Sequence, residues 1–592
     1  MLPSSPPTES FSRTRPPIDS SLRSQIETDH NLWEVACENS HYRLKLSVLA
    51  GSPAVGWQFS SVQKYMSTLP PVEIPIPPHP LKRTIGTKIV HNVASGLIRM
   101  VVIAPVPFLL TPFLLRHLGT QGFGAWAVFL SINSLTSLAD IGVMGTLTKH
   151  VSEHYTRRDY ANLNKVVNAG ILIFLAVAVM GVLVVNLAAG FLTSVFFRNV
   201  QVSHAQLQFV IHLLTVSIAL NLLTYPFSSV ISGLQRLDFI NLFWALSTII
   251  TAVGAAFFVS LGLGIEGLVY AIVLTSSLLF ILNMAVSRHL LPQLRVRPAS
   301  VRWSDIKDLS AFSSQIYVSQ MATAVYIHME KLLLAHFTGL TAAGWYDIAN
   351  DLATKIRNVP ALLITPLMPA AAELDARQDD ARARELYYRA HKYLAFVGVG
   401  MFLVVALLAH RFVELWLGTG FDGTARALIV LSGVQIGNLV GAPALLILIG
   451  KGILQPAVRF ALVGMTGTLI VSTTLIATFG FTGALYGTSV SVLGAAAYLV
   501  FLFHQETGYA GRTLLKIYAT PVLLGTCLGG LSMRLFPIGR LYFGGMICMS
   551  LALAAVYTFT LLLLRYFDGL DLRVLERFMP IPEVVRKSSL FS

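Results

Sequence analysis

The stretch "DIANDLATKIRN", residues 347–358, places four charged side chains within twelve residues of a strongly apolar chain. On a helix, at about 100° per residue, its charged and amide side chains share one face and its aliphatic side chains share the other. The apolar residues that follow, 359–372, would measure only about 21 Å as a helix, too short to cross a hydrocarbon core of about 30 Å. The charged stretch therefore belongs to a membrane-spanning helix over about 342–371, with its polar face inside the bilayer.

The composition of the whole chain agrees with this reading. Of its 592 residues, 54% are hydrophobic and 12% are charged, and the mean hydropathy is +0.67. A soluble domain of this size needs more polar surface than these residues supply. The three cysteines form neither a disulfide framework nor a metal-ligand spacing, so we expect no metal site. A polytopic helical membrane protein is the only class that fits.

Apolar segments long enough to cross a membrane follow one another from about residue 90. We predict about fourteen spans, near 90–116, 122–147, 166–192, 207–234, 239–261, 265–286, 309–336, 342–371, 390–410, 424–449, 455–479, 482–504, 514–535 and 541–565. Most of the 43 Lys and Arg residues fall in the loops on one side, which places both termini in the cytoplasm. This asymmetry accounts for the net charge of +14 without a nucleic-acid partner.

The two halves of the chain repeat. "LGTQGFG" at 118–124 matches "TGLTAAG" at 338–344, and "NLLTYPFSSVISG" at 221–233 matches "NLVGAPALLILIG" at 438–450. The ordered Gly, Asn and Pro matches indicate two parallel repeats, a plan common among secondary transporters. We therefore expect an all-α polytopic membrane protein in which two six-helix repeats form two lobes around a central cavity, with two extra helices at the C-terminus.

These patterns divide the chain into six parts. They are a Pro- and Ser-rich disordered tail (1–85), an N-lobe (86–286), a cytoplasmic linker (287–308), a C-lobe (309–504), two further spans (505–565) and a basic cytoplasmic tail (566–592). The residues leave open whether translation begins at Met1 or at Met66.

Polar stripes mark the helices that face the cavity. The stripes run along span 1 (Lys88, Asn92, Ser95, Arg99), span 2 (Asn133, Thr136, Ser137, Asp140), span 7 (Gln315, Ser319, Thr323, Tyr326, Glu330) and the opening stretch in span 8. Steps of three or four residues keep each set on one helix face. Because spans 1 and 7, and spans 2 and 8, are repeat equivalents, the cavity is lined by matched pairs.

Charges inside a membrane need water or a partner, and the sequence leaves two readings open for several of them. Lys355 either forms an i, i+4 ion pair with Asp351 or binds a ligand. Arg99 and Arg357 have no acidic residue at that spacing. Glu330 is either a proton or sodium site or a buried neutral acid.

The segment "TPFLLRHLGTQGFGAWAVFLSINSLTSLADIGVMGTLTKHVSEH", residues 111–154, resembles the opening signature of polysaccharide biosynthesis flippases. "EKLLLAHFTGLTAAGWYDIANDL", residues 330–352, resembles the matching segment of their second lobe. The resemblance extends from residue 88 to about 570 and points to the multidrug/oligosaccharidyl-lipid/polysaccharide (MOP) exporter superfamily. It implies a two-lobed exporter of the bacterial cytoplasmic membrane, working by alternating access on undecaprenyl-pyrophosphate-linked oligosaccharides such as O-antigen units.

This resemblance and the polar stripes together suggest roles for individual residues. Cavity cations would attract the pyrophosphate (Arg99, Lys355, Arg357), polar side chains would bind sugar (Asn92, Gln315, Tyr326, Asn350, Asn358), and acids would couple transport to H⁺ or Na⁺ (Asp140, Glu330, Asp351). We expect a monomer without a cofactor, with the lipid bilayer, the lipid-linked oligosaccharide and a polysaccharide polymerase as partners.

Other functions remain to be weighed. A lipid II flippase or a multidrug/cation antiporter of the same superfamily would have the same lobes. A membrane glycosyltransferase or polymerase would need a large extramembrane loop or a pair of catalytic carboxylates. The linker 287–308 provides neither, so we expect a transporter with no catalytic residues.

Overall fold

The computed structural model describes residues 34–38, 41–45, 99, 102–134, 143–197, 203–297, 301–453, 455–569 and 571, without side chains at 34–45, 304–305 and 308–320. Internal contacts divide the chain into two units, Met1–Lys82 and Arg83–Ser592. In the first unit, β1 (Glu34–Glu38) pairs with β2 (His41–Lys45) in an antiparallel hairpin. This hairpin was not predicted; the rest of the 1–82 unit lies outside the described residues.

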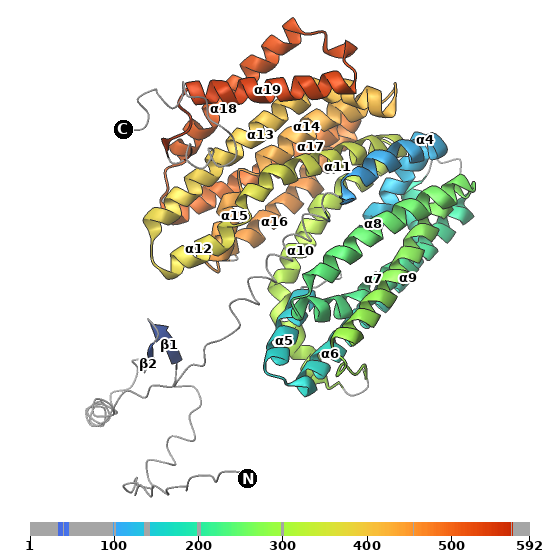
Figure 1. Cartoon of the computed structure of the whole chain (residues 1–592). Coiled ribbons are helices and arrows are strands. Elements are labelled where there is room, and N and C mark those ends of the chain that lie inside the picture. The colour runs from blue at the N-terminus through green and yellow to red at the C-terminus, as the bar shows by residue number, and fades with distance from the viewer. Residues whose placement is uncertain are drawn as a thin grey trace, which may run out of the picture. The chain divides into compact units, whose positions relative to one another are not determined.

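The second unit is helical (Figure 1). Its first half contains α4 (Pro105–Ser134), α5 (Val143–Thr156), α6 (Tyr160–Phe196), α7 (His204–Gly233), α8 (Leu237–Ser260) and α9 (Gly264–Leu290). Its second half contains α10 (Trp303–Phe337), α11 (Leu340–Ala361), η3 (Leu362–Ile364), α12 (Leu367–Ala376), α13 (Asp380–Leu417), α14 (Asp422–Asn438), α15 (Ala442–Gly450), α16 (Gln455–Gly467), η4 (Thr468–Ser472) and α17 (Thr473–Thr507). The chain continues through α18 (Gly511–Leu535), η5 (Ile538–Arg540) and α19 (Phe543–Leu563).

The helices agree closely with the predicted spans and confirm the all-α class. Among the described residues, ten helical segments are long and apolar enough to cross a membrane. One of them, Gln455–Thr507, contains two predicted spans, which meet where Gly480 adopts non-helical angles (φ 58°, ψ −133°). Gly119 likewise breaks α4 where spans 1 and 2 were expected to meet. The number of fourteen spans stays a prediction.

The repeat is visible in the turns that precede α6 and α13. The Asp159 side chain caps α6 by accepting the N–H of Asn162 at 3.1 Å, and Asp379 caps α13 in the same way, from Arg382 at 3.1 Å. The residue before each cap, Arg158 or Gln378, has a positive φ of 56° or 55°. Equivalent ion pairs precede both turns, Arg157 with Glu153 and Arg377 with Glu373. Identical local chemistry therefore recurs at the offset of 220 residues that the sequence predicted.

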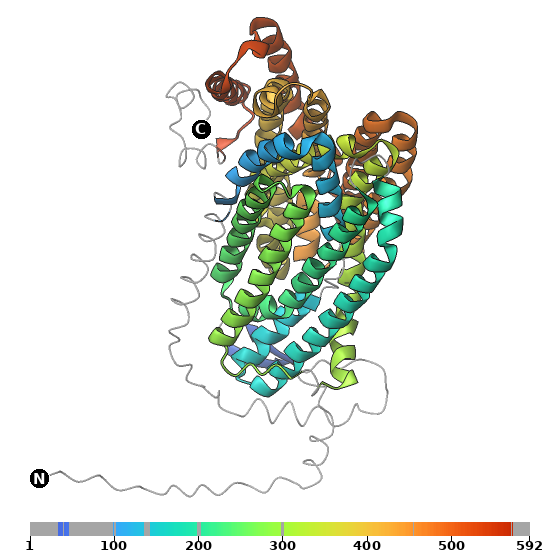
Figure 2. The ribbon, with the colours of Figure 1, turned by 90° about the vertical axis from the view of Figure 1, so that its right-hand side faces the viewer.

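The helices form two lobes. In the N-lobe (α4–α9), α7 packs against α5, α6 and α9, and α8 packs against α9; these helices run side by side in Figure 2. In the C-lobe (α10–α17), α11 packs against α14, α13 against α14, and α16 against α17. The two lobes meet through α4 and α11, and α10 contacts helices of both.

The α4–α11 contact is a close crossing of two glycines. A Cβ atom added at Gly124 would lie 1.8 Å from the carbonyl oxygen of Leu340, and one added at Gly344 would lie 3.2 Å from the Cα of Gly124. These glycines are repeat equivalents, since they end the matching segments 118–124 and 338–344. Small residues allow such close backbone approach between helices in lipid. Nearby, Trp416 donates its indole N–H to the carbonyl of Phe108 at 2.9 Å and so joins the lobes a second time.

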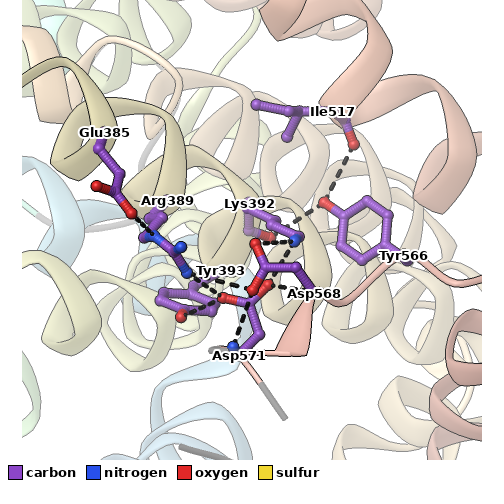
Figure 3. Close-up of polar contacts among 8 residues, drawn as sticks. All are labelled: Glu385, Arg389, Lys392, Tyr393, Ile517, Tyr566, Asp568 and Asp571. Carbon is purple, nitrogen blue, oxygen red and sulfur yellow. Dashed lines mark hydrogen bonds and ion pairs between the residues drawn. The ribbon is translucent and has the colours of Figure 1, made fainter. Parts of the chain in front are cut away.

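The C-terminal helices are fastened to the C-lobe by a buried carboxylate (Figure 3). Asp571 is fully buried and accepts hydrogen bonds from Arg389 (2.8 Å) and Tyr393 (2.7 Å), and it forms an ion pair with Lys392. All three partners lie on α13. Asp568 shares the two cations, at 3.4 Å from Arg389 and 3.6 Å from Lys392. Two bases of α13 therefore face two acids of the C-terminal segment, and Arg389 also pairs with the exposed Glu385 of its own helix at 2.8 Å, which indicates a structural clasp.

A tyrosine extends this clasp to α18. Tyr566 donates its hydroxyl to the carbonyls of Lys392 at 3.2 Å and Ile517 at 3.1 Å, so one side chain connects α13, α18 and the segment after α19. Hydrogen bonding from Asp571 N–H and the charges of Lys392 and Arg389 outweigh the effect of burial, and they hold the pKa of the Asp568 carboxyl below its ordinary value. The Asp568 carboxyl of the clasp therefore stays ionised.

We predict that Gly124→Val separates α4 from α11, because no position for the new side chain avoids the Leu340 carbonyl. The contact between Phe108 and Trp416 should then be lost. In a variant whose native cysteines are serine, cysteines at 108 and 416 should be joined by a short bis-maleimide several-fold less efficiently. Gly181→Val on α6 is the matched control, since a Cβ there meets no atom within 4 Å. Equal cross-linking in both variants would contradict the tight crossing.

We predict that Asp571→Asn lowers the melting temperature of the purified protein, because it leaves Arg389 and Lys392 without their shared buried carboxylate. Breaking a buried pair in this way costs about 3–5 kcal/mol. Glu385→Gln is the control: it removes another acid from Arg389, but one that is 54% exposed. The clasp would be unimportant if both substitutions shifted the melting temperature equally.

Candidate functional site

The charged stretch 347–358 lies on α11, and its burial follows the predicted two faces. Ile348, Leu352 and Ala353 are buried in the core, whereas Asp351 and Asn358 are exposed. Asn350, Lys355 and Arg357 are half-buried. We call these five polar residues, together with Gln435 of α14, the polar wall.

Three of the four charges in the stretch are paired with a residue of opposite charge. Lys355 forms an ion pair with Asp351 one turn earlier, the structural alternative that the spacing had left open. Asp347 differs from the prediction, which placed it on the polar face. It forms an ion pair with Lys331 of α10, and both side chains are less than 15% exposed. Pairing between α10 and α11 therefore removes Asp347 from the polar wall.

Arg357 has a different environment. Its Nη1 donates to Oε1 of Gln435 at 3.0 Å, and its Nη2 donates to Oδ1 of Asn358 at 3.5 Å. Gln435 in turn donates from Nε2 to Oδ1 of Asn350 at 3.4 Å. Within the part of the chain that the structure describes, no carboxylate lies within 4 Å of the guanidinium. Among the residues that the structure describes, no acid is therefore paired with the positive charge of Arg357.

Sequence reasoning missed Gln435. It is the only amide between Asp422 and Ile436, in a span that is otherwise apolar or small apart from Arg426 and two hydroxyl residues. A lone glutamine in such a span is a signal that could have been followed, because an amide in lipid needs a partner. Its partner could not be known before α14 was seen to pack against α11.

Glu330 is buried within the C-lobe. It is 2% exposed, and its Oε1 accepts the hydroxyl of Ser472 at 2.6 Å. Its Oε2 has no hydrogen-bond partner among the described residues. Ser472 ends the π-helical turn η4, a type of distortion that is frequent at functional sites. Ser491 Oγ lies 3.5 Å from Ser472 Oγ, so oxygen atoms from α10, η4 and α17 converge here.

Two further hydroxyls complete this group. Tyr346 of α11 and Thr488 of α17 are hydrogen-bonded at 2.9 Å, and Thr488 lies beside Glu330. The group consists of one carboxylate and several hydroxyls, which are ligands suited to H⁺ or to a hard cation such as Na⁺. The described residues contain no cluster of three or more His, Cys, Asp or Glu side chains suited to a transition metal.

The other predicted site residues are placed only in part. Tyr326 packs its ring over Gly464 of α16, where an added Cβ would lie 3.1 Å from the ring. Arg99 is helical and half-buried. Asn92 and Asp140 lie outside the described residues, and Gln315 lies on α10 at a position whose side chain is not described. The structure thus brings five of the predicted residues together on α11 and places Glu330 in a separate buried group, and the roles predicted for all of them stay predictions.

Apolar cavities lie on the other side of α14. One of about 430 Å³ is an open pocket between α13, α14 and α18, and another of about 550 Å³ is an open pocket between α14, α17 and α18. Both are lined by Gly437 of α14 and by Val440, which follows that helix. The helix that carries Gln435 therefore separates a polar wall from a space suited to hydrocarbon.

Comparison with known proteins places these features in context. The family described as "Polysaccharide biosynthesis protein" matches residues 89–375. A curated protein of Shigella flexneri named "Putative O-antigen transporter" is 17% identical over 338 residues, which cover 56% of this chain and 77% of that protein. Both matches confirm the resemblance read from the sequence.

Solved structures share the fold. The lipid II flippase MurJ in an inward closed conformation matches with a TM-score of 0.56 at 12% identity, covering 77% of this chain and 98% of that chain. An inward-facing multidrug resistance MATE family transporter of the MOP superfamily matches with a TM-score of 0.54 at 14% identity, covering 71% and 99%. The curated relative is named a transporter and the two solved structures a flippase and a transporter, which confirms the expected class of a multi-pass membrane transporter.

Proposed function

We propose that this membrane transporter, a relative of the polysaccharide biosynthesis family, flips an undecaprenyl-pyrophosphate-linked oligosaccharide between the leaflets of the bacterial cytoplasmic membrane by alternating access. The proposal rests mainly on the environment of Arg357. This cation lies on the polar face of α11, and its hydrogen-bond partners are neutral. A pyrophosphate cannot enter hydrocarbon without a compensating charge. Such a cation, which is paired with no acid of the described segments, supplies that charge.

The rest of the polar wall suits the rest of the headgroup. Asn350 and Asn358 offer amide donors and acceptors to sugar hydroxyls. A guanidinium presents five N–H donors, and only two of them are engaged by Gln435 and Asn358. The apolar cavities beyond α14 are of a kind that accepts hydrocarbon, so the prenyl chain can stay in lipid beside the C-lobe.

The ion whose gradient drives transport would bind at Glu330. Its free Oε2 and the hydroxyls of Ser472, Thr488 and Ser491 form an oxygen-rich pocket for H⁺ or Na⁺. Because the pocket joins α10, η4 and α17, occupancy would alter how these helices pack. We propose it as the coupling site in preference to Asp351, which is neutralised by Lys355.

Two other substrates define the alternatives. A multidrug antiporter carries cations, and Arg357 would repel them. A lipid II flippase carries the same pyrophosphate, so the polar wall does not separate it from our proposal, and only complementation with defined lipid-linked glycans does. We further propose cytoplasmic termini, a monomeric transporter and a polysaccharide polymerase as functional partner.

We predict that Arg357→Ala reduces export at least about tenfold, because one charge-assisted contact contributes roughly 1.5–3 kcal/mol. The assay is a strain deleted for this gene that expresses each variant at matched levels. It measures surface polysaccharide and the pool of lipid-linked oligosaccharide that stays on the cytoplasmic leaflet. Arg357→Lys should retain part of the activity.

Arg426→Ala is the matched control, since Arg426 is an exposed cation near the start of α14, more than two turns from Gln435. Export should be unchanged in that variant. Normal export by Arg357→Ala would remove the basis of the proposal.

We predict that Na⁺ or a change of pH alters the melting temperature of the wild-type protein and that Glu330→Gln abolishes this response. Glutamine keeps the size and the contact with Ser472 but cannot carry the charge that binds a cation. The measurement compares sodium with choline chloride at two pH values. Glu373→Gln, at an exposed acid of α12, should respond as wild type does. A wild-type protein that is indifferent to both variables would rule out this coupling site.

A further inference from the structure

We infer that Gln435 is a positioning residue that fixes the direction of the Arg357 guanidinium without consuming its charge. The inference rests on the proposed function, because it assumes that Arg357 receives an anionic headgroup. It adds a specificity-determining position on α14, a helix that sequence patterns had not connected with the substrate.

The geometry defines the orientation of the Gln435 amide. A guanidinium only donates hydrogen bonds, so the atom 3.0 Å from Arg357 Nη1 must be the carbonyl oxygen Oε1. The NH₂ group then points to Asn350, whose Oδ1 accepts at 3.4 Å. Gln435 thus connects two residues of α11 that lie two turns apart, and it holds the arginine from a second helix.

The contrast with the neighbouring cations shows why the neutrality of Gln435 matters. Lys331 on α10 is paired with Asp347, and Lys355 on α11 is paired with Asp351. Arg357 is held by the amides of Gln435 and Asn358, and no carboxylate of the described residues lies within 4 Å of it. A carboxylate in place of the amide would hold the guanidinium equally well, but it would also neutralise it. The amide at position 435 therefore fixes the orientation of the Arg357 guanidinium and leaves its net charge unchanged.

This separation predicts opposite effects on stability and on binding. Gln435→Glu creates an ion pair with Arg357, so the substituted protein should be at least as stable as wild type but should bind an anionic headgroup more weakly. Gln435→Met, which keeps length but cannot accept a hydrogen bond, releases the guanidinium and should weaken binding to a smaller extent. A residue with a purely structural role would change stability and binding in the same direction.

The test uses the purified full-length protein in lipid nanodiscs, with farnesyl pyrophosphate as the soluble probe and farnesol as the uncharged control ligand. We expect Gln435→Glu to raise the Kd for farnesyl pyrophosphate at least about tenfold, equivalent to 1.4 kcal/mol. The Kd for farnesol should be unchanged. The same substitution in an Arg357→Ala background should have little further effect, because Gln435 acts through the arginine.

The outcomes separate the inference from the proposed function. If Arg357→Ala binds farnesyl pyrophosphate as wild type does, the proposed headgroup site is wrong. If Arg357→Ala weakens binding but Gln435→Glu and Gln435→Met do not, the headgroup site stands and the positioning role is overturned. The positioning role is also overturned if Gln435→Glu weakens binding equally in the Arg357→Ala background.

Discussion

The arrangement of the lobes depends on one backbone contact, the crossing of α4 and α11 at Gly124 and Gly344. In lipid there is little hydrophobic gain from bringing two apolar helices together. Close packing and weak polar contacts must therefore supply the free energy of association. A glycine on each helix allows the backbones to approach until a Cβ on Gly124 would overlap the Leu340 carbonyl. The two glycines occupy equivalent positions in the repeats, and each lies at the contact. The contact holds the first residue of α11, Leu340, against α4. It thereby also sets the position of the polar face of α11 relative to α4.

Charge balance explains which polar residues are structural. In the Asp571 clasp two bases are paired with acids on every side, and Lys331–Asp347 and Lys355–Asp351 each match one acid with one base. Arg357 and Glu330 depart from this rule within the described residues: the first has amide partners, and the second has hydroxyl partners and one free oxygen. A charge left uncompensated in a membrane destabilises the fold, so its retention indicates a use beyond folding.

Patterns within single helices were enough to predict much of the fold from the sequence. The span positions, the repeat offset and the two faces of residues 347–358 follow from hydropathy and from helical periodicity, which are properties of single helices. Contacts between helices were not accessible in this way. Asp347 was placed on the polar face because its own helix permits it, but Lys331 of α10 draws it inward. Gln435 and Ser472 became visible as partners only when α14 and η4 were placed against α11 and α10.

The same distinction bears on how substrates could diverge within this fold. The glycine crossing and the capped turns before α6 and α13 set the scaffold, and they place no charge on the polar wall. The sign of the wall is set instead by whether the partner of each cation is an acid or an amide. A single exchange between carboxylate and carboxamide, as at position 435, changes the net charge of the wall by one unit. The size of the side chain and the reach of its hydrogen bonds are preserved. The charge of the substrate that the wall prefers can therefore change with little effect on the packing of the helices. At position 435 this is possible because the partner, on α14, and the cation that it holds, on α11, lie on different helices.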